Sequence, residues 1–379
     1  MRLALAASYA LVPLIACSGK ADDSGSAAAD PSSARVATYN AGLATGFVTF
    51  APEREAEVVS ALTGLDADIV CLQEVWTSDS IAAILDGVSG TYPHSYVEVT
   101  AEDGVDEPAC TEEEIDPLAE CARAACEGAE NLTNCVLGSC GDEFGALSDG
   151  CTECAAANVG LNDIDAIVDT CLTGSSSYAW GGHNGLILLS RTEISDTASL
   201  DLDAWLVWRS VISAEVDGLD VSCTHLAAAL NSPAYGGADY ASYEAEQAGQ
   251  IDAMLAWIGD RVGDGPAVLL GDMNTGPEAA GGITAELPDN WARFGAAGWV
   301  DPNVEASAPF CTWCADNTIA GDGSDHDSVD TILDHVLVSG AEGSAPERIL
   351  DGTVTITVDG ASVDTSLSDH YGVAATVIW

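Results

Sequence analysis

The fold is decided by one stretch of sequence, Ala67-Asp68-Ile69-Val70-Cys71-Leu72-Gln73-Glu74. Its apolar run predicts a short buried strand, and the strand stops at two polar side chains. Apolar residues at helical spacing predict a helix on each side of it, over residues 53–62 and 78–85, the second with Ser78 or Asp79 as its N-cap. With a short β-type run over 35–40, the chain begins β-α-β-α.

Further apolar runs continue this pattern in the second half of the chain. Asp217-Gly218 marks a hairpin turn between two of them, and residues 240–258 predict a helix. Mixed strands with helices on the outside favour an α/β sandwich. The expected strands cover 185–190, 210–215, 220–224, 267–270, 332–338, 353–358 and 372–378.

The charge balance is extreme. The 379 residues include 61 acidic and 10 basic side chains, with a net charge of -51, and Lys20 is the single lysine. Such a chain repels polyanions at long range, and it lacks the basic footprint of nucleic-acid-binding proteins. The composition favours a protein that stays soluble in salty surroundings, and it makes nucleic acid the less favoured partner.

The N-terminus predicts export. Residues 1–16 combine one arginine, a short apolar run and small residues, which is typical of a secretory signal peptide. Leu14-Ile15-Ala16-Cys17 resembles a bacterial lipobox, so we expect lipidation of Cys17; an ordinary signal peptide with a chance cysteine is the alternative. Residues 18–34 are expected to form a flexible tether, followed by one domain over 35–379. The protein would then be a membrane-anchored lipoprotein or secreted.

Thirteen cysteines in an exported chain predict disulfides. A Glu-, Asp-, Ala- and Cys-rich stretch at about 100–178 has weak periodicity and predicts an insertion outside the main sheet. Its even number of cysteines favours up to four bridges, with the pairing left open. These cysteines are Cys110, Cys121, Cys126, Cys135, Cys140, Cys151, Cys154 and Cys171.

The other four cysteines of the domain have different expected states. Cys311 and Cys314 form a CTWC motif that suits a redox dithiol, half a zinc site or a local structural disulfide, and the compartment favours the disulfide. Cys71 and Cys223 lie in apolar strand patterns, where we expect buried free thiols.

Polar side chains follow the apolar strands at the points where these end. Loops at strand ends of a rigid sheet are a usual home for active sites. Taken singly, several of these residues have ordinary explanations, since Gly-Asp-Met-Asn also suits a turn. Asp334 lies inside an apolar strand, however, and a buried carboxylate needs a partner such as a histidine or a metal. The set comprises Asn40, Glu74, His225, Asp272, Asn274, Asp334, Asp369 and His370.

Seven motifs in order resemble the endonuclease/exonuclease/phosphatase superfamily with its DNase I-like fold. The LQEVW and THL segments, with the acidic and aromatic start of the helix at 240–244, also resemble the neutral sphingomyelinase branch. The resemblance implies a four-layer α/β/β/α sandwich with a site at one end. The motifs are TYN at 38–40, LQEVW at 72–76, NGLILLSR at 184–191, THL at 224–226, GDMN at 271–274, LDHV at 333–336 and SDHYGV at 368–373.

The resemblance also implies a metal site. Glu74 corresponds to the main ligand, with Asn40 and Asp369 as further ligands, direct or through water. Oxygen ligands favour a hard cation, so we expect Mg²⁺, with Mn²⁺ or Ca²⁺ as alternatives.

Other residues carry over as the catalytic set. Asp272 and Asn274 would position the attacking water and steady the phosphoryl oxygens. His225 and His370 would flank the scissile phosphate, one contacting it and one acting in acid/base catalysis, and their order stays open. Asp334 would orient His370.

Three residues near the third strand complete the set. His183 and Asn184 would contact the substrate, whereas Arg191 is expected to form a structural ion pair.

The resulting expectation is an exported, divalent-metal-dependent phosphodiesterase. A phospholipid or small phosphodiester is favoured as substrate, with membrane contact through the lipid anchor and a monomeric chain. The alternatives are an extracellular nuclease and, in another functional class, an inactive binding module whose working part is the cysteine-rich insertion.

Overall fold

The computed structural model describes residues 32–98, 107–129, 132–161, 163–174, 184–230, 233–320 and 329–379. The expected signal segment, the lipidation site Cys17, most of the tether and the substrate-contacting candidate His183 lie outside these residues. The first strand begins at Ser33, which pairs with Ile378. Residues 33 and 34, expected in the tether, therefore belong to the sheet.

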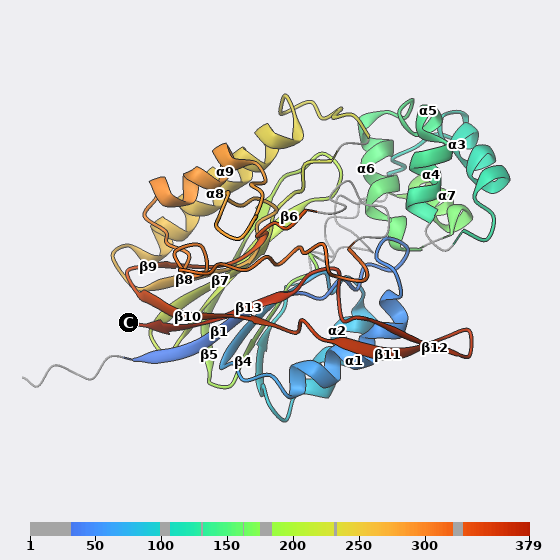
Figure 1. Ribbon diagram of the computed structural model, residues 1–379. Helices are drawn as coiled ribbons and strands as arrows, with labels where there is room; N and C mark the ends of the chain where they lie inside the picture. The colour runs from blue at the N-terminus through green and yellow to red at the C-terminus, as the bar shows by residue number, and fades with distance from the viewer. Residues whose placement is uncertain are drawn as a thin grey trace, which may run out of the picture. The chain divides into compact units, whose positions relative to one another are not determined.

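Two β-sheets form the centre of the domain (Figure 1). The first has the strand order β10-β13-β1-β2-β4-β3 and the second the order β5-β6-β7-β8-β9. The first contains β1 (Ser33–Asn40), β2 (Ile69–Gln73), β3 (His94–Tyr96), β4 (Ile187–Ser190), β10 (Glu342–Ile349) and β13 (Gly372–Ile378). The second contains β5 (Ile194–Leu202), β6 (Arg209–Val216), β7 (Leu219–His225), β8 (Ala267–Asp272) and β9 (Asp334–Ser339).

The continuous apolar run of β2 is explained by burial of both its faces. Ile69 and Cys71 pack between the two sheets, against Val221 of the second sheet. Val70 and Leu72 point the other way, into the layer beneath the helices. Alternate side chains of a strand point to opposite faces, so a strand covered on both sides is apolar throughout.

Helices cover both outer faces, as Figure 1 shows. On the first sheet lie α1 (Ala51–Thr63) and α2 (Ser78–Val88), which bury Val58 and Ile84. On the second lie α8 (Tyr243–Val262) and α9 (Pro288–Ala296), which bury Met254 and Phe294. The four-layer α/β/β/α sandwich is confirmed.

The N-cap of α2 differs from the prediction by one residue. Thr77 is the cap, because its side chain accepts a hydrogen bond from the Ser80 backbone N–H. Ser78 and Asp79 lie in the first helical turn instead.

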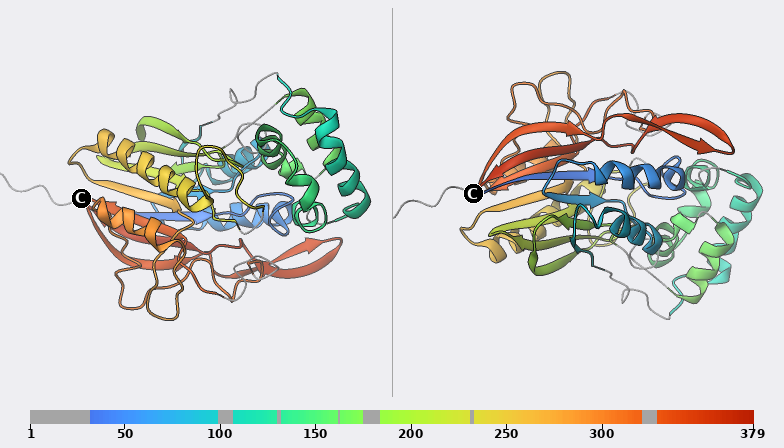
Figure 2. Two further views of the ribbon diagram at one scale, coloured as in Figure 1. Left: turned by 90° about the horizontal axis from the view of Figure 1, so that it is seen from above. Right: turned by 90° about the horizontal axis from the view of Figure 1, so that it is seen from below.

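The cysteine-rich insertion is a separate group of helices between β3 and β4 (Figure 2). Its helices have their own apolar core, which includes Ile115, Leu118 and Phe144. The insertion has four bridges, the largest number expected, and the structure gives their pairing as Cys110–Cys151, Cys121–Cys140, Cys126–Cys135 and Cys154–Cys171. The helices are α3 (Glu112–Ala125), α4 (Leu132–Ser139), α5 (Gly141–Phe144), α6 (Asp149–Ala157), the short 3₁₀ helix η2 (Val159–Leu161) and α7 (Ile164–Thr173).

A two-stranded ribbon, β11 (Thr353–Val358) and β12 (Ala361–Ser366), precedes the last strand. It pairs with neither large sheet. Among the described residues, no helix has the length and hydropathy needed to cross a membrane.

The expectation of free thiols at Cys71 and Cys223 is wrong. The two residues form a disulfide between β2 and β7, across a sequence separation of 152 residues. Both side chains lie between the sheets. The bridge therefore links the two sheets covalently at a place where the apolar sequence predicts only hydrophobic packing.

Because this bridge closes so long a loop, its removal should cost much stability. Replacing Cys71→Ala and Cys223→Ala together should lower the free energy of unfolding by about 5 kcal/mol, since the unfolded chain regains its loop entropy. Guanidinium unfolding measures the change. The matched control removes Cys311 and Cys314, which are three residues apart, and should cost about 2 kcal/mol. Equal losses in the two variants would contradict the loop-entropy account.

A second prediction concerns Glu153 of α6. Burial, followed by the negative charges of Asp149, Asp239 and Glu246, raises the pKa of this carboxyl from 4.5 to about 7. The folded state therefore holds the proton more tightly than the unfolded state, and stability is lost as the pH rises from about 4.5 to about 7. Glu153→Gln should stabilise the protein at pH 8 by about 1 kcal/mol, after allowance for partial exposure.

Thermal unfolding at pH 8 and at pH 5 tests this, with Glu120→Gln on the exposed face of α3 as a charge-matched control. The stabilisation should be smaller at pH 5 and smaller in the control. A Glu153→Gln effect that does not depend on pH would contradict the prediction.

Candidate active site

Strand direction brings the predicted site residues to one edge of the sandwich. β1 and β2 run parallel, as do β7 and β8, so Asn40, His225 and Asp272 lie at strand ends on the same side. β9 runs antiparallel to β8, with Asp334 opposite Asp272. β13 runs antiparallel to β1, which brings His370, just before it, to this edge as well.

Asp272 lies at the centre of the site. Its Oδ2 atom accepts a hydrogen bond from Asn40 Nδ2 at 3.0 Å, and it lies 3.5 Å from His225 Nε2 and 3.7 Å from His370 Nε2. Its Oδ1 atom accepts from the backbone N–H of Asn274 at 2.9 Å. Burial, which the His370 charge partly offsets, raises the pKa of Asp272 to about 6. One carboxylate thus joins side chains from both sheets.

Asp334 and His370 form a hydrogen-bonded pair. His370 Nδ1 lies 2.8 Å from Asp334 Oδ2, and both side chains are buried. Burial alone would lower the pKa of His370, but the carboxylates of Asp334 and Asp272 outweigh it and raise that pKa well above its ordinary value. The ligand atoms of Asp272, Asp334 and His370 also lie within 4.8 Å of one another, a spacing that a metal ion could bridge.

The CTWC segment, residues 311–314, contacts both Asp334 and His370. Thr312 Oγ1 accepts from the Asp334 backbone N–H at 3.0 Å, and the Thr312 carbonyl accepts from the Tyr371 N–H. The Trp313 ring meets the His370 ring edge-on at 5.0 Å between centroids. Cys311 and Cys314 are bonded to each other, so the structural disulfide is confirmed. Their sulfurs are not zinc ligands in this state, although Asp330 lies beside them.

His225 has a different neighbour. Arg209, the first residue of β6, lies with Nη1 3.2 Å from His225 Nδ1. The guanidinium also covers the Trp76 ring at 5.4 Å. Burial, followed by the positive charges of Arg209 and His370, lowers the pKa of His225 well below its ordinary value. No motif marks Arg209 as a site residue, because it lies at the start of a strand outside every recognised motif.

Asn40, Glu74 and Asp369 form an oxygen-rich group beside Asp272. Glu74 Oε1 accepts from Asn40 Nδ2 at 2.9 Å, whereas Glu74 Oε2 is buried and has no hydrogen-bond partner. A Cβ at Gly42 would lie 2.6 Å from Asp369 Oδ1, so the Asp369 carboxylate approaches the loop after Asn40 closely. Burial and the Asp369 charge raise the pKa of Glu74 to about 7.

This group fits a hard divalent cation. The carboxylates of Glu74 and Asp369 lie close together, one Glu74 oxygen is buried without a partner, and carboxylate oxygens are the ligands that a hard cation prefers. Asn40 directs its Nδ2 toward Glu74, and its Oδ1 accepts a hydrogen bond from the Gly42 N–H. Glu74 also has a left-handed backbone, with φ 57°. Such strain in a non-glycine residue persists where the surroundings hold it, often at functional sites.

Arg54 supports this group from behind and was missed by the sequence analysis. It is fully buried on α1 and donates hydrogen bonds to the carbonyls of Gly42 and Leu367. It thereby joins the loops that carry Asn40 and Asp369. Its sequence neighbours, Pro-Glu-Arg-Glu, are typical of an exposed helix, so no local signal marked it.

The other two asparagines of the predicted set, Asn274 and Asn184, also lie at this edge. Asn274 Nδ2 donates to the Leu226 carbonyl at 2.9 Å, which fixes the loop after His225. Asn184 is buried; its Oδ1 accepts from the Leu186 N–H, and its Nδ2 has no partner. That free donor is available to an anionic ligand. Arg191 pairs with Asp68, as expected for a structural role.

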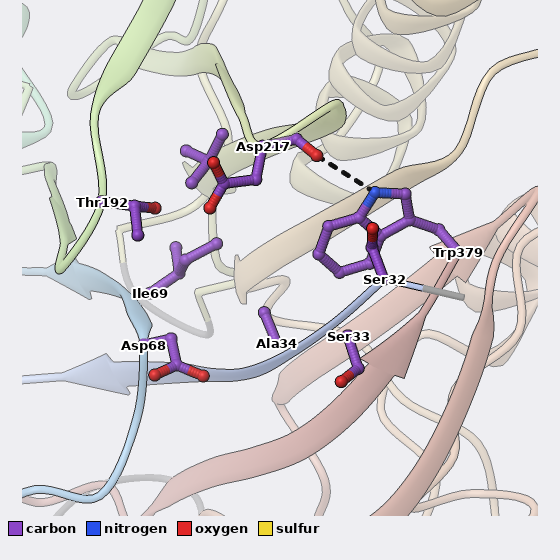
Figure 3. A pocket seen from close by; sticks show the side chains of 9 residues that line it. Ser32, Ser33, Ala34, Asp68, Ile69, Thr192, Asp217 and Trp379 are labelled. Atoms are coloured by element: carbon purple, nitrogen blue, oxygen red, sulfur yellow. Dashed lines mark hydrogen bonds between the residues drawn. The ribbon is translucent and has the colours of Figure 1, made fainter. Parts of the chain in front are cut away.

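A separate pocket lies at the opposite ends of these strands (Figure 3). Its volume is about 570 Å³, and it is lined by Ser33 at the start of β1, by Asp68 before β2 and by Trp379. The Trp379 indole donates to the Asp217 carbonyl. The pocket shares no residue with the candidate site and contains no histidine.

Comparison with solved structures shows the same fold. Sphingomyelinase C from Streptomyces griseocarneus aligns with a TM-score of 0.54 at 19% identity, over 91% of this chain and 99% of that chain. An endonuclease/exonuclease/phosphatase family protein from Bacteroides thetaiotaomicron aligns with a TM-score of 0.51 at 13% identity, over 92% of this chain and 99% of that chain. A mutant beta toxin from Staphylococcus aureus with bound magnesium ions aligns with a TM-score of 0.50 at 12% identity, over 91% of this chain and 99% of that chain.

No curated protein sequence matches this chain significantly. A family model does match, over residues 37–370, a span that holds every candidate site residue from Asn40 to His370. The chain belongs to the endonuclease/exonuclease/phosphatase family.

Proposed function

We propose that the protein is an exported phosphodiesterase that depends on a divalent metal and hydrolyses a phospholipid or small phosphodiester. The observation that carries the proposal is the convergence of Asn40, His225 and His370 on one oxygen of Asp272. The oxygen ligands Glu74 and Asp369 lie beside this centre. Phosphodiester hydrolysis needs a placed water, proton transfer and compensation of phosphoryl charge, and this edge of the sandwich offers a group for each.

The metal would be held by Glu74, Asn40 and Asp369. Bound there, it would supply positive charge for the phosphoryl oxygens and the leaving group. Mg²⁺ is the proposed ion, because the donors are hard oxygens and because the beta toxin structure of the same fold has bound magnesium ions. Mn²⁺ and Ca²⁺ are alternatives with the same donor preference.

The protein's own side chains would do the remaining work. Asp272 and Asn274 would hold the attacking water in line. His370, with the Asp334 carboxylate behind it, is the ring able to carry a proton, whereas His225 would contact the phosphate. Asn184 would offer its free Nδ2 donor to a phosphoryl oxygen.

Three features support a lipid or small phosphodiester over DNA. The chain has a net charge of -51. Most arginines of the described residues pair with carboxylates away from the site, for example Arg261 with Asp220 and Arg293 with Asp252. A structure of the same fold is named a sphingomyelinase.

The proposed location is outside the cytoplasm. The six disulfides indicate an oxidising compartment. We further propose lipidation at Cys17, which would hold a monomeric enzyme at a membrane surface.

A substrate panel tests the function. With Mg²⁺ present, the protein should hydrolyse sphingomyelin or bis-p-nitrophenyl phosphate faster than it nicks plasmid DNA. Chelation should abolish turnover, and Glu74→Gln should weaken Mg²⁺ binding measured by calorimetry, because the buried carboxylate loses its charge. Glu347→Gln, on the exposed side of β10, is the control and should bind the metal normally.

Plasmid nicking without cleavage of the other substrates would favour the nuclease alternative. Absence of turnover with every substrate and with Mg²⁺, Mn²⁺ or Ca²⁺ would favour the inactive binding module.

His370 gives a second test. His370→Ala should lower kcat by roughly 10²–10⁴, the usual contribution of a general acid or base. Asp334→Asn should move the His370 limb of the pH–rate profile to lower pH, because the carboxylate that raises the His370 pKa is gone. Steady-state kinetics across pH measures both effects, with His94→Ala on β3 as a histidine control outside the site. Near wild-type turnover of the His370→Ala enzyme would refute the role.

A further inference from the structure

Arg209 and Asp334 lie behind the two site histidines and have opposite charges. Each histidine directs Nε2 toward Asp272 Oδ2 and uses Nδ1 for its other neighbour. Behind His370 that neighbour is the Asp334 carboxylate, which can only accept a hydrogen bond from an N–H. Behind His225 it is the Arg209 guanidinium.

A guanidinium has donors and no acceptor. The contact of 3.2 Å between Arg209 Nη1 and His225 Nδ1 therefore requires a lone pair on Nδ1. A neutral imidazole carries one proton, so the proton of His225 is on Nε2, facing the centre of the site. A carboxylate in the place of Arg209 would require the opposite tautomer or the doubly protonated ring.

We propose that Arg209 is a positioning residue that holds His225 as the neutral tautomer with its proton on Nε2, so that His225 donates a hydrogen bond to a phosphoryl oxygen and does not transfer the proton. The role at the phosphate rests on the proposed function. The tautomer itself does not, because it follows from the contact with Arg209.

The surroundings hold Arg209 in place for this role. Its guanidinium covers the face of Trp76, and Trp76 in turn lies 6.2 Å from the His225 ring between centroids. Gly185 lets the backbone approach this tryptophan, since a Cβ there would come within 2.8 Å of the indole. The cation, the aromatic ring and the imidazole thus form one packed group at the ends of β2, β4, β6 and β7.

The chemical advantage lies in the charge that develops on the phosphate. Negative charge on the phosphoryl oxygens is stabilised by preorganised donors in a site that excludes water. A cation behind the imidazole polarises the Nε2–H bond and keeps the ring from taking up a second proton. The lowered pKa of His225 agrees with this arrangement.

Nitrogen-15 NMR of the imidazole rings tests the proposal directly. The chain has six histidines, and the His225→Gln variant identifies the signals of His225. In the wild-type protein at pH 7, with and without Mg²⁺, the spectrum should show a protonated Nε2 and an unprotonated Nδ1. A protonated Nδ1 in the wild type would overturn the proposal without any need for a variant.

Two substitutions complete the test. Arg209→Lys keeps a positive donor and should keep the Nε2–H tautomer, whereas Arg209→Glu should shift the proton to Nδ1 or protonate both nitrogens. Identical His225 spectra in the wild type and a folded Arg209→Glu protein would overturn the proposal. Near-UV circular dichroism reports folding of each variant.

Kinetics separates this inference from the proposed function. With the preferred phosphodiester, Arg209→Met should lower kcat by roughly 10²–10³, the cost of losing one oriented donor, with little change in KM, and Arg209→Lys should restore most of the loss. A wild-type kcat for Arg209→Met would refute the donor role. If no substrate is turned over, the proposed function fails while the NMR result still decides the tautomer.

Discussion

The burial of the Asp272 carboxylate is the constraint on which the rest of the site depends. Asp272 is 1% exposed, and a buried carboxylate without partners is costly. Here the partners come from both sheets: Asn40 from the first, the Asn274 N–H from the second, and His370 from the loop before β13. The Asn274 contact is local in the chain, whereas the contacts of Asn40 and His370 with Asp272 form only when the two sheets pack in one register. Packing of the two sheets therefore assembles this part of the site.

Other buried groups fix the same register from different directions. The Cys71–Cys223 bridge joins β2 and β7 three residues before Glu74 and two before His225. Arg54 donates hydrogen bonds to the loops on the side of the candidate metal ligands. On the other side of the site, Thr312 and Trp313 of the CTWC segment contact Asp334 and His370. Burial is the main cause that raises the pKa of Glu74 and of Asp272, and a neighbouring carboxylate adds to it in each case: Asp369 for Glu74 and Asp334 for Asp272. Buried carboxyl groups with raised pKa values are typical of a functional site, and a cation site contains them before the cation binds.

The sequence predicted the parts of this site that lie in strands and failed on the parts that depend on tertiary contact. Glu74, His225 and Asp272 are recognisable because an apolar run stops at a polar residue, which is a local signal. Arg209 and Arg54 look like ordinary surface arginines, since their meaning comes from residues distant in the chain. The Cys71–Cys223 bridge was missed for the same reason. A cysteine in a buried strand has the same local pattern whether or not another strand brings a second cysteine opposite it.

Under the proposed function, the acidity of the chain would restrict the size of the substrate more than the charge of the group that enters the site. Exposed charges are screened beyond about 8 Å at physiological ionic strength, so most of the 61 carboxylates do not act on a single phosphodiester inside the site. There, Arg209 and a bound cation would offset the negative charges of Glu74 and Asp272. A polyanion is different, because it must lie along several turns of surface and meets unscreened carboxylates at each contact. Under the proposed function, the site would therefore accept one phosphodiester group, whereas the acidic surface would repel a nucleic acid.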